Sequence, residues 1–326
     1  MPADISKLWQ LADIITPFAI RVAATLRVAD HVAAGTTEIN DLARVVGAAP
    51  DALGRLLRYL AARDLFTETA PGRFAVTELG ALLRDDDPRA SRRWLDLDGF
   101  GGTMDLSFTE LLTTVRTGRS PRSVRDTEIP DAIRDSFDDM MEAQSRQQTP
   151  AIVQGWDWSR VEHVADLGGG TGTLLLGLLS ANPDMQATLM EMTRAADRAR
   201  RLMAEENIAE RCEVIAGDFF EEPLPAADVY VLKFVLHGLA DEEAVTLLSR
   251  CRAAGEKGAR VLVIERSLGP GDDRQAFTAM DLRMLILGTG RERTLEEYAA
   301  LAVRAGMRLT AATPTAVDVH LIELMP

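Results

Sequence analysis

A glycine-rich stretch near the middle of the chain constrains the fold more than any other feature of the sequence. It reads V-A-D-L-G-G-G-T-G-T over residues 164–173, so that four glycines follow a short apolar run. Glycine allows the backbone to adopt positive φ and to approach a ligand closely. In α/β sheets, ligands bind beyond the carboxyl ends of the strands. The stretch therefore predicts a buried strand, a ligand-binding turn and then a helix.

Short apolar stretches alternate with amphipathic stretches from Trp156 onward. The pattern predicts strands at 161–167, 187–192, 213–217, 229–232 and 260–265, and helices near 173–181, 193–208, 241–255 and 274–288. Such alternation is typical of a parallel sheet with helices on both faces. The last two predicted strands, 308–312 and 317–324, are close in sequence and are expected to form an antiparallel edge pair.

The N-terminal part of the chain has a different pattern, with helices and one hairpin. A break is expected near Thr16, because Pro17 interrupts the first helical pattern. A short helix that stops at Gly47, a second that starts at Pro50, and two strands around Pro71-Gly72 together predict a winged helix. A winged helix can bind DNA, or it can serve as a packing or dimerisation module.

The charge of the chain argues against nucleic acid as a partner. It holds 36 Lys and Arg against 50 Asp and Glu, and residues 1–90 hold 10 against 12. Phosphate binding needs a basic surface, so we expect the winged helix to pack or dimerise. The sequence has no apolar run of 18 residues, no secretion signal, and two cysteines outside any metal-binding motif. We therefore expect no membrane contact, no metal and a cytoplasmic location.

Three types of loop are alternatives for the glycine stretch. A dinucleotide loop would place its last glycine at Thr173, and a P-loop would need a lysine that the stretch lacks. What remains is D-x-G-x-G-x-G, which begins at Asp166. This spacing favours a ligand that lies along Gly168 and Gly170 and has no pyrophosphate.

Acidic residues after the next two strands favour a nucleoside in that ligand. Glu191 ends the second predicted strand, where a carboxylate can accept hydrogen bonds from both ribose hydroxyls. Asp218 and Phe219 follow the third strand, where the carboxylate can accept from an adenine amino group and the ring can pack on the base. These features in this order predict S-adenosylmethionine (SAM) as the cofactor.

Four segments resemble the class I SAM-dependent small-molecule O-methyltransferases, which include plant caffeate and flavonoid enzymes and bacterial polyketide-tailoring enzymes. They read V-A-D-L-G-G-G-T-G-T, G-D-F-F, V-Y-V-L-K-F-V-L-H and G-R-E-R-T-L-E-E-Y. The resemblance covers nearly the whole chain and implies a Rossmann-like α/β sheet of seven strands. It also implies a helical, winged-helix-like dimerisation domain at 1–100, a helical linker or substrate lid at 101–155, and a SAM-binding catalytic domain at 156–326.

The same resemblance implies an activity and the residues that perform it. The enzyme would be a homodimer that methylates an aromatic hydroxyl of a natural product, as in antibiotic biosynthesis. The implied residues are His237 as general base with Glu265 and Glu292 beside it, Lys233 for SAM, and Met141 and Met284 for the substrate. The chemistry is consistent, because a phenol of pKa about 10 is protonated at neutral pH and a histidine of pKa about 6.5 can take its proton.

Histidines elsewhere in the chain give a comparison for His237. His31 lies on a helix face, His163 precedes the first strand of the sheet and His320 lies in the last strand, so we expect none of them at the ligand end. The family reads L-H-D-W where residues 236–239 read L-H-G-L. The acid beside the base is therefore absent, and some support of the base is expected to be lost.

Two alternatives to methyl transfer follow from these observations. One is a SAM-binding enzyme of the same fold that performs hydroxylation, decarboxylation or cyclisation, which the missing acid next to His237 motivates. The other is a winged-helix regulator that senses a small molecule, which the absence of a basic stripe disfavours.

Overall fold

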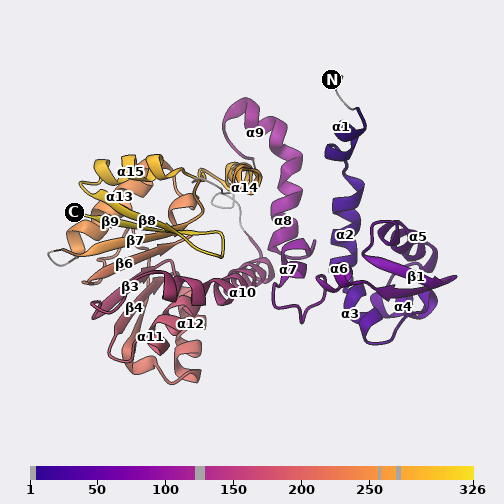
Figure 1. The fold of residues 1–326 in the computed structure, drawn as a ribbon, viewed down its shortest axis with the longest axis horizontal. Coiled ribbons are helices and arrows are strands. Elements are labelled where there is room, and N and C mark those ends of the chain that lie inside the picture. Colours follow the sequence, from indigo (N-terminus) through magenta and orange to yellow (C-terminus); the bar gives the residue numbers. More distant parts are fainter. Residues whose placement is uncertain (1–4, 122–128, 256–257, 269–272) are drawn as a thin grey trace. The chain divides into compact units, whose positions relative to one another are not determined.

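A computed structural model describes residues 5–121, 129–255, 258–268 and 273–326 (Figure 1). Contacts within the chain divide it into two compact units. Residues 1–106 and 130–143 form the first unit, and residues 107–129 and 144–326 form the second. The division into domains at residues 100 and 155 stays a prediction.

The first unit consists of helices and one small hairpin. Its elements are α1 (Ile5–Leu11), α2 (Ile15–Thr25), α3 (Val28–Ala33), α4 (Ile39–Val46), α5 (Pro50–Ala61), β1 (Phe66–Ala70), β2 (Arg73–Val76), α6 (Glu78–Ala81), α7 (Ser91–Leu95), α8 (Phe100–Leu106) and the first part of α10 (Asp131–Gly155). Helix α4 ends at Gly47 with a φ of +67°, and β1 pairs with β2 in antiparallel fashion. The helix–turn–helix–hairpin order expected of a winged helix is therefore present.

The break predicted near Thr16 falls slightly earlier, between Leu11 and Ile15. The Asp13 carboxylate, one residue before the N-cap, accepts hydrogen bonds from the backbone N–H groups of Ile15 (2.9 Å) and Thr16 (3.2 Å) in the first turn of the new helix. Pro17 lies in the first turn of α2, where a missing N–H removes no helical hydrogen bond. The proline thus marks the start of the second helix.

The second unit is built around the predicted sheet. Its elements are η1 (Ser107–Glu110), α9 (Leu111–Thr117), the rest of α10, β3 (His163–Leu167), α11 (Thr173–Ala181), β4 (Gln186–Glu191), α12 (Thr193–Glu205), η2 (Ala209–Arg211), β5 (Cys212–Ala216), β6 (Val229–Lys233), η3 (Leu236–Gly238), α13 (Asp241–Ala254), β7 (Arg260–Glu265), α14 (Arg274–Leu287), α15 (Leu295–Arg304), β8 (Arg308–Pro314) and β9 (His320–Met325). Every predicted strand and helix is present with shifts of a few residues at its ends. The sequence pattern did not predict α15, which lies between α14 and β8.

Within the described ranges, seven strands form one sheet in the order β5-β4-β3-β6-β7-β9-β8. Strands β3 to β7 run parallel, whereas β9 pairs antiparallel with both β7 and β8. The order reverses at β3, between β4 and β6. In a doubly wound sheet this reversal opens a crevice at the carboxyl ends of the strands.

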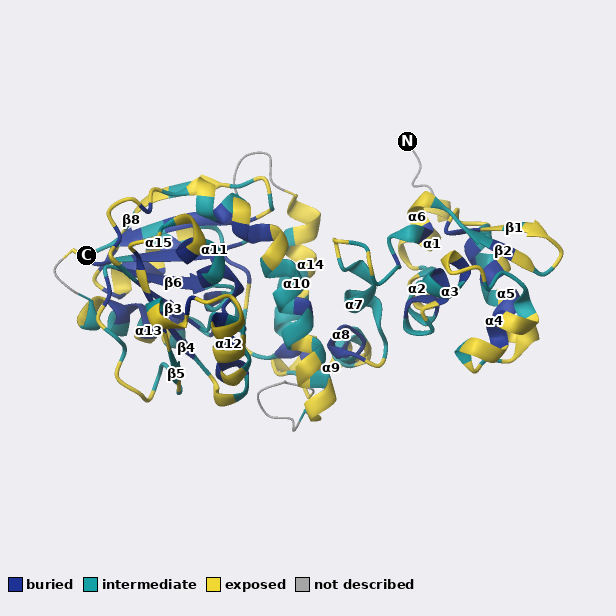
Figure 2. Ribbon diagram, turned by 90° about the horizontal axis from the view of Figure 1, so that it is seen from below, coloured by how far each residue is buried: buried dark blue, intermediate teal, exposed yellow. Residues whose placement is uncertain are grey.

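Two apolar cores cover the two faces of this sheet, and the inner strands β3, β6 and β7 are buried along most of their length (Figure 2). One core joins the sheet to α13 and α15 through side chains such as Leu247 and Leu301. The other joins it to α11 and α12 through side chains such as Leu178 and Met203. Strands buried on both faces explain why the predicted strands read as continuous apolar runs.

One expectation about the histidines was wrong. Because β9 runs antiparallel to β7, its first residue, His320, pairs with Glu265 at the carboxyl end of β7. His320 therefore lies at the ligand end of the sheet, although it is buried. His163 starts β3 at the opposite end, where Nε2 contacts the Thr188 hydroxyl at 2.8 Å.

Candidate active site

The glycine loop follows β3 directly and is held to the next strand. The backbone N–H of Gly168 donates to the Met190 carbonyl (2.9 Å), and Gly168 has a φ of +76°. A methyl group on Gly169 would collide with the carboxylate of Asp166. Glycine at these two positions thus permits a turn that packs tightly over the end of β3.

Asp166 is fully buried within β3, and neither of its carboxylate oxygens has a hydrogen-bond partner among the described residues. Burial raises the pKa of Asp166 to about 7, although the positive charge of Lys233 acts in the opposite direction. A buried carboxylate without a partner is costly. Asp166 lies against the glycine loop, so a charged ligand bound at this loop would change the protonation of its carboxyl group.

A cavity of about 600 Å³ opens beyond the carboxyl ends of β4 and β5. Its lining comprises Glu191, Met192, Gly217, Asp218, Phe219, Phe220, Leu239 and Glu243. A methyl group on Gly168 would lie 3.6 Å from the Phe219 ring and 3.7 Å from Glu191 Oε2, so the glycine loop borders the same residues. The structure thus brings together the loop, Glu191, Asp218 and Phe219, as the sequence predicted.

The side chains that line this cavity fit a nucleoside. A carboxylate at Glu191 can accept from two ribose hydroxyls, and the Asp218 carboxylate can accept from an amino group. The Phe219 ring supplies an apolar face for a base. The volume also lies in the range of small-molecule sites. These residues could therefore hold the adenosine part of SAM.

Lys233 is the last residue of β6, and its side chain is partly buried. Nζ donates to Ser145 Oγ (3.3 Å) and lies 4.8 Å from the centroid of the Phe234 ring. Burial lowers the pKa of Lys233 to about 8, while the carboxylates of Asp166 and Glu265 act to raise it. The positive charge of Lys233 therefore interacts both with Asp166, on the glycine-loop strand, and with Glu265, beside His237.

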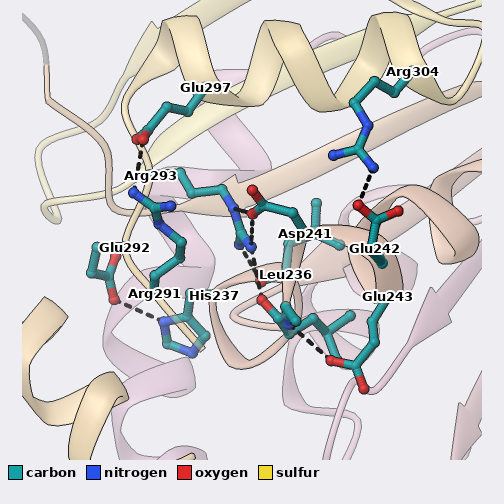
Figure 3. A network of polar contacts seen from close by, with 12 residues as sticks. Leu236, His237, Asp241, Glu242, Glu243, Arg291, Glu292, Arg293, Glu297 and Arg304 are labelled. Carbon is teal, nitrogen blue, oxygen red and sulfur yellow. Dashed lines mark hydrogen bonds and ion pairs between the residues drawn. The ribbon is translucent and has the colours of Figure 1, made fainter. Parts of the chain in front are cut away.

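A short turn after β6, the 3₁₀ helix η3, carries His237 (Figure 3). Nδ1 of His237 lies 2.9 Å from Glu292 Oε1 and 3.7 Å from Glu265 Oε2. The backbone N–H of His237 donates to Glu265 Oε1 (3.2 Å). Both glutamate side chains are 0% exposed, whereas that of His237 is 16% exposed. The structure thus assembles the predicted triad and leaves the imidazole accessible.

The two carboxylates control the protonation of this centre. Burial alone would lower the pKa of His237, but the negative charges of Glu265 and Glu292 outweigh it and raise the pKa. Burial, with repulsion from Glu292, raises the pKa of Glu265 to about 7. When the imidazole is neutral, the Glu292 carboxylate can only accept a hydrogen bond from it, which favours the proton on Nδ1 of His237 and leaves the lone pair on Nε2. The arrangement suits proton abstraction by Nε2.

The residue that follows the base lacks the family's acidic side chain. A methyl group on Gly238 would meet no described atom within 4 Å, so the missing acid leaves open space there. Support of the imidazole nevertheless comes from Glu292 and Glu265, both of which contact His237.

Sequence reasoning overlooked Arg293, which is buried next to Glu292. Its guanidinium donates to the carbonyl oxygen of Leu236 (2.6 Å), the residue before His237 (Figure 3). It also donates to the carbonyl oxygen of Leu239 (2.7 Å), two residues after His237.

The two methionines expected to contact the substrate are partly buried. Met284 lies on α14 in the second unit, and Met141 lies on the part of α10 that belongs to the first unit. Their role in substrate binding stays a prediction.

The described ranges contain no group of three or more His, Cys, Asp or Glu side chains placed to hold a metal ion. None of the helices in these ranges combines the length and apolar character that a bilayer crossing requires.

Comparison with protein families gives two matches. A model of the O-methyltransferase domain matches residues 118–308, and a model of the O-methyltransferase dimerisation domain matches residues 9–86. The two matches correspond to the SAM-type sheet and to the winged-helix region.

Individual relatives cover nearly the whole chain. The 2,7-dihydroxy-5-methyl-1-naphthoate 7-O-methyltransferase of Streptomyces carzinostaticus is 43% identical over 93% of this chain and 93% of its own. The aclacinomycin 10-hydroxylase RdmB of Streptomyces purpurascens is 42% identical over 93% of this chain and 84% of its own. A crystal structure of an O-methyltransferase from neocarzinostatin biosynthesis, with S-adenosyl-L-homocysteine and 1,4-dihydroxy-2-naphthoic acid, has a TM-score of 0.89 at 42% identity over 97% of this chain and 98% of its own.

Proposed function

The chain belongs to the O-methyltransferase family as a SAM-dependent enzyme, and we propose that it methylates a hydroxyl group on the fused aromatic ring of a natural product. The observation that carries this proposal is the geometry of His237. Its Nδ1 is held by a buried glutamate at 2.9 Å while its side chain stays accessible. A base of this kind is what a hydroxyl acceptor requires.

The proposed reaction begins with the proton of the acceptor hydroxyl. Nε2 of His237 takes this proton as the oxygen becomes nucleophilic, and the resulting imidazolium is stabilised by Glu292 and Glu265. Bound SAM supplies an electrophilic methyl group whose departure leaves a neutral thioether. Because the leaving group is good, alignment of the acceptor oxygen should contribute much of the rate.

The cofactor would be held by the residues around the cavity. Glu191 would accept from the ribose hydroxyls, Asp218 would accept from the adenine amino group, and Phe219 would supply an apolar face for the base. Gly168 and Gly170 let the backbone approach the remaining part of the molecule. We assign Lys233 and Asp166 to the same end of the site, where their opposite charges interact.

The relatives support an aromatic acceptor with fused rings, since one acts on a dihydroxynaphthoate and a solved structure contains another. Met284 and Met141 are proposed to contact this acceptor. The 10-hydroxylase relative keeps the second candidate, non-methylating chemistry on the same fold, in consideration. The complete His237, Glu265 and Glu292 centre favours methyl transfer, because a hydroxyl acceptor gives each of these groups a role.

We also propose that the enzyme is a cytoplasmic homodimer that pairs through its winged-helix region. Helices α1 and α2 and their junction expose apolar side chains, each more than 60% exposed in the single chain: Ile5, Leu8, Trp9, Leu11, Ile14 and Ile15. Such a patch is unusual on a monomer, and the dimerisation-domain match begins at residue 9. The domain division at 100 and 155 belongs to the same proposal. Light scattering should give twice the 35.6 kDa chain mass, and Trp9→Asp should reduce it.

The direct test uses SAM labelled in its methyl group with a panel of hydroxynaphthoates and larger polycyclic phenols. We expect label in the product together with equimolar S-adenosylhomocysteine. Conversion of an acceptor without SAM consumption would instead support the non-methylating candidate. His31→Ala, in the first unit, is the matched control for changes at His237, because His31 has no proposed role.

A further inference from the structure

The turn that carries His237 is held by a segment far from it in the sequence, residues 290–293. The backbone N–H of Arg291 donates to the His237 carbonyl (2.8 Å), and Glu292 contacts its imidazole. A methyl group on Gly290 would collide with the same carbonyl. Backbone and side chain of the base are thus both contacted by one segment.

Arg293 completes this contact by holding the two ends of the turn. Its Nη1 donates to the carbonyl of Leu236, the residue before His237, and its Nη2 to the carbonyl of Leu239, two residues after it. A planar guanidinium presents its donors in a rigid fork and can bridge two such acceptors at fixed spacing, whereas an ammonium group on a flexible stem does not fix that spacing. The residue therefore fixes where the turn begins and where it ends.

The charge of Arg293 is compensated within the same network. The side chain is 1% exposed, and Asp241 Oδ1 accepts from Nε (3.1 Å) and Nη2 (2.7 Å). The Arg293 guanidinium holds the pKa of Asp241 below its usual value. Ser267, which lies two residues beyond Glu265, donates from its hydroxyl to the Arg293 carbonyl (3.0 Å). One buried arginine thus links the η3 turn, the start of α13 and the segment after β7.

We propose that Arg293, with Asp241 as its counter-ion, is a positioning residue that fixes the imidazole of His237 against Glu292 and Glu265. This inference rests on the proposed role of His237 as base. Glu292 is the neighbour of Arg293 in the chain, so the same segment places the carboxylate and the turn that the carboxylate must meet. Loss of the two carbonyl bonds would let the turn move relative to Glu292.

The first test is independent of activity. The imidazole nitrogens of the four histidines are followed by ¹⁵N NMR over a pH range, with His237 assigned by its absence in His237→Gln. In Arg293→Met we expect the pKa of His237 to fall toward about 6.5, because its carboxylates no longer face it in the same geometry. The titration curves of His31 and His163 should be the same in Arg293→Met as in the unaltered enzyme.

The second test is kinetic. We expect kcat for methyl transfer to fall about 100-fold in Arg293→Met, because a small displacement of a catalytic group has effects of that size. The kcat of Arg293→Lys should lie between those of the unaltered enzyme and Arg293→Met. Added guanidinium ion should partly restore the kcat of Arg293→Met. The KM for SAM should rise by a smaller factor than kcat falls, because Leu239 is only one of the residues that line the cofactor cavity.

Arg304→Met is the matched control. Arg304 also reaches α13, where it contacts Glu242 (2.6 Å), but the Arg304 side chain is 42% exposed and that of Glu242 84% exposed. It should leave the His237 titration and kcat unchanged. If Arg293→Met does not fold, Arg293→Lys and Asp241→Asn give the same test, with smaller shifts in the same direction.

The outcomes separate this inference from the proposed function. An unchanged His237 titration in folded Arg293 variants would overturn the positioning role, whatever the activity. A shifted titration with no methyl transfer in the unaltered enzyme would support the positioning role and overturn the proposed reaction.

Discussion

The cofactor cavity and the His237 centre lie at the same edge of one sheet but are built differently. The cavity is lined mainly by residues at the ends of β4 and β5, and the glycine loop after β3 borders it, so most of its parts are short local motifs. Leu239 and Glu243, from the segment after β6, complete the lining. The His237 centre joins three segments, and the contact between His237 and Glu292 spans 55 positions. The comparison shows that ligand binding here depends on strand ends, whereas the proposed chemistry depends on long-range side-chain packing.

The largest expected effect separates these two regions. His237→Ala should lower kcat for methyl transfer by about 10³-fold, because it removes the general base. The dissociation constant for SAM, measured by calorimetry, should change by less than about twofold, because His237 is absent from the cavity lining. A variant that loses SAM binding as well would contradict the separation.

The second change acts on the cavity alone. Glu191→Gln should raise the dissociation constant for SAM by about 10–100-fold, because it weakens charge-assisted hydrogen bonds to the ribose. At saturating SAM, kcat should stay within about threefold of the unaltered enzyme. Glu213→Gln, on the exposed side of β5, is the control and should bind SAM normally. An unaffected dissociation constant in Glu191→Gln would remove Glu191 from the binding site.

The two regions also differ in how far the sequence predicted them. The strand ends, the glycine loop and the Glu191, Asp218 and Phe219 set follow from local patterns, because a parallel sheet brings consecutive strand ends to one edge. The prediction for His320 was wrong, because β9 inserts between β7 and β8 and runs antiparallel to β7. Its first residue therefore lies at the carboxyl end of β7, and no local pattern indicates this.

Arg293 was overlooked for a related reason. A buried arginine is recognisable only once its carbonyl partners, Leu236 and Leu239, are in place. Glu265 and Glu292 were identified through a family resemblance, since no local pattern links residues so far apart. Long-range polar contacts are therefore the part of this site that the sequence alone does not predict.

The third change sharpens the electrostatics of the His237 centre. Glu292→Gln removes one of the two charges that raise the pKa of His237, so this pKa should fall. The base is active when neutral, and the rising limb of the pH–rate profile should therefore move to lower pH. At the plateau the rate should drop about tenfold, because the imidazolium loses a partner. A limb that moves to higher pH would contradict this account of Glu292.

The smallest effect is expected at Gly238. Gly238→Asp restores the acid that the family places beside its base, and the space around this position accommodates it. The free energy of unfolding should change by less than about 0.5 kcal/mol, as for other open positions. A further negative charge should raise the pKa of His237 and move the limb slightly to higher pH. Thermal unfolding checks the free energy of unfolding, and the pH–rate profile checks the pKa of His237.

The central claim is that His237, held by buried carboxylates, removes the proton of an aromatic hydroxyl during methyl transfer. The most direct measurement is the pH dependence of single-turnover transfer of labelled methyl from SAM to a hydroxynaphthoate. The account predicts a rate that rises with pH to a plateau, with a midpoint above the ordinary histidine pKa of about 6.5, and no such limb in His237→Ala. A rate that is independent of pH, or an identical limb in His237→Ala, would contradict it.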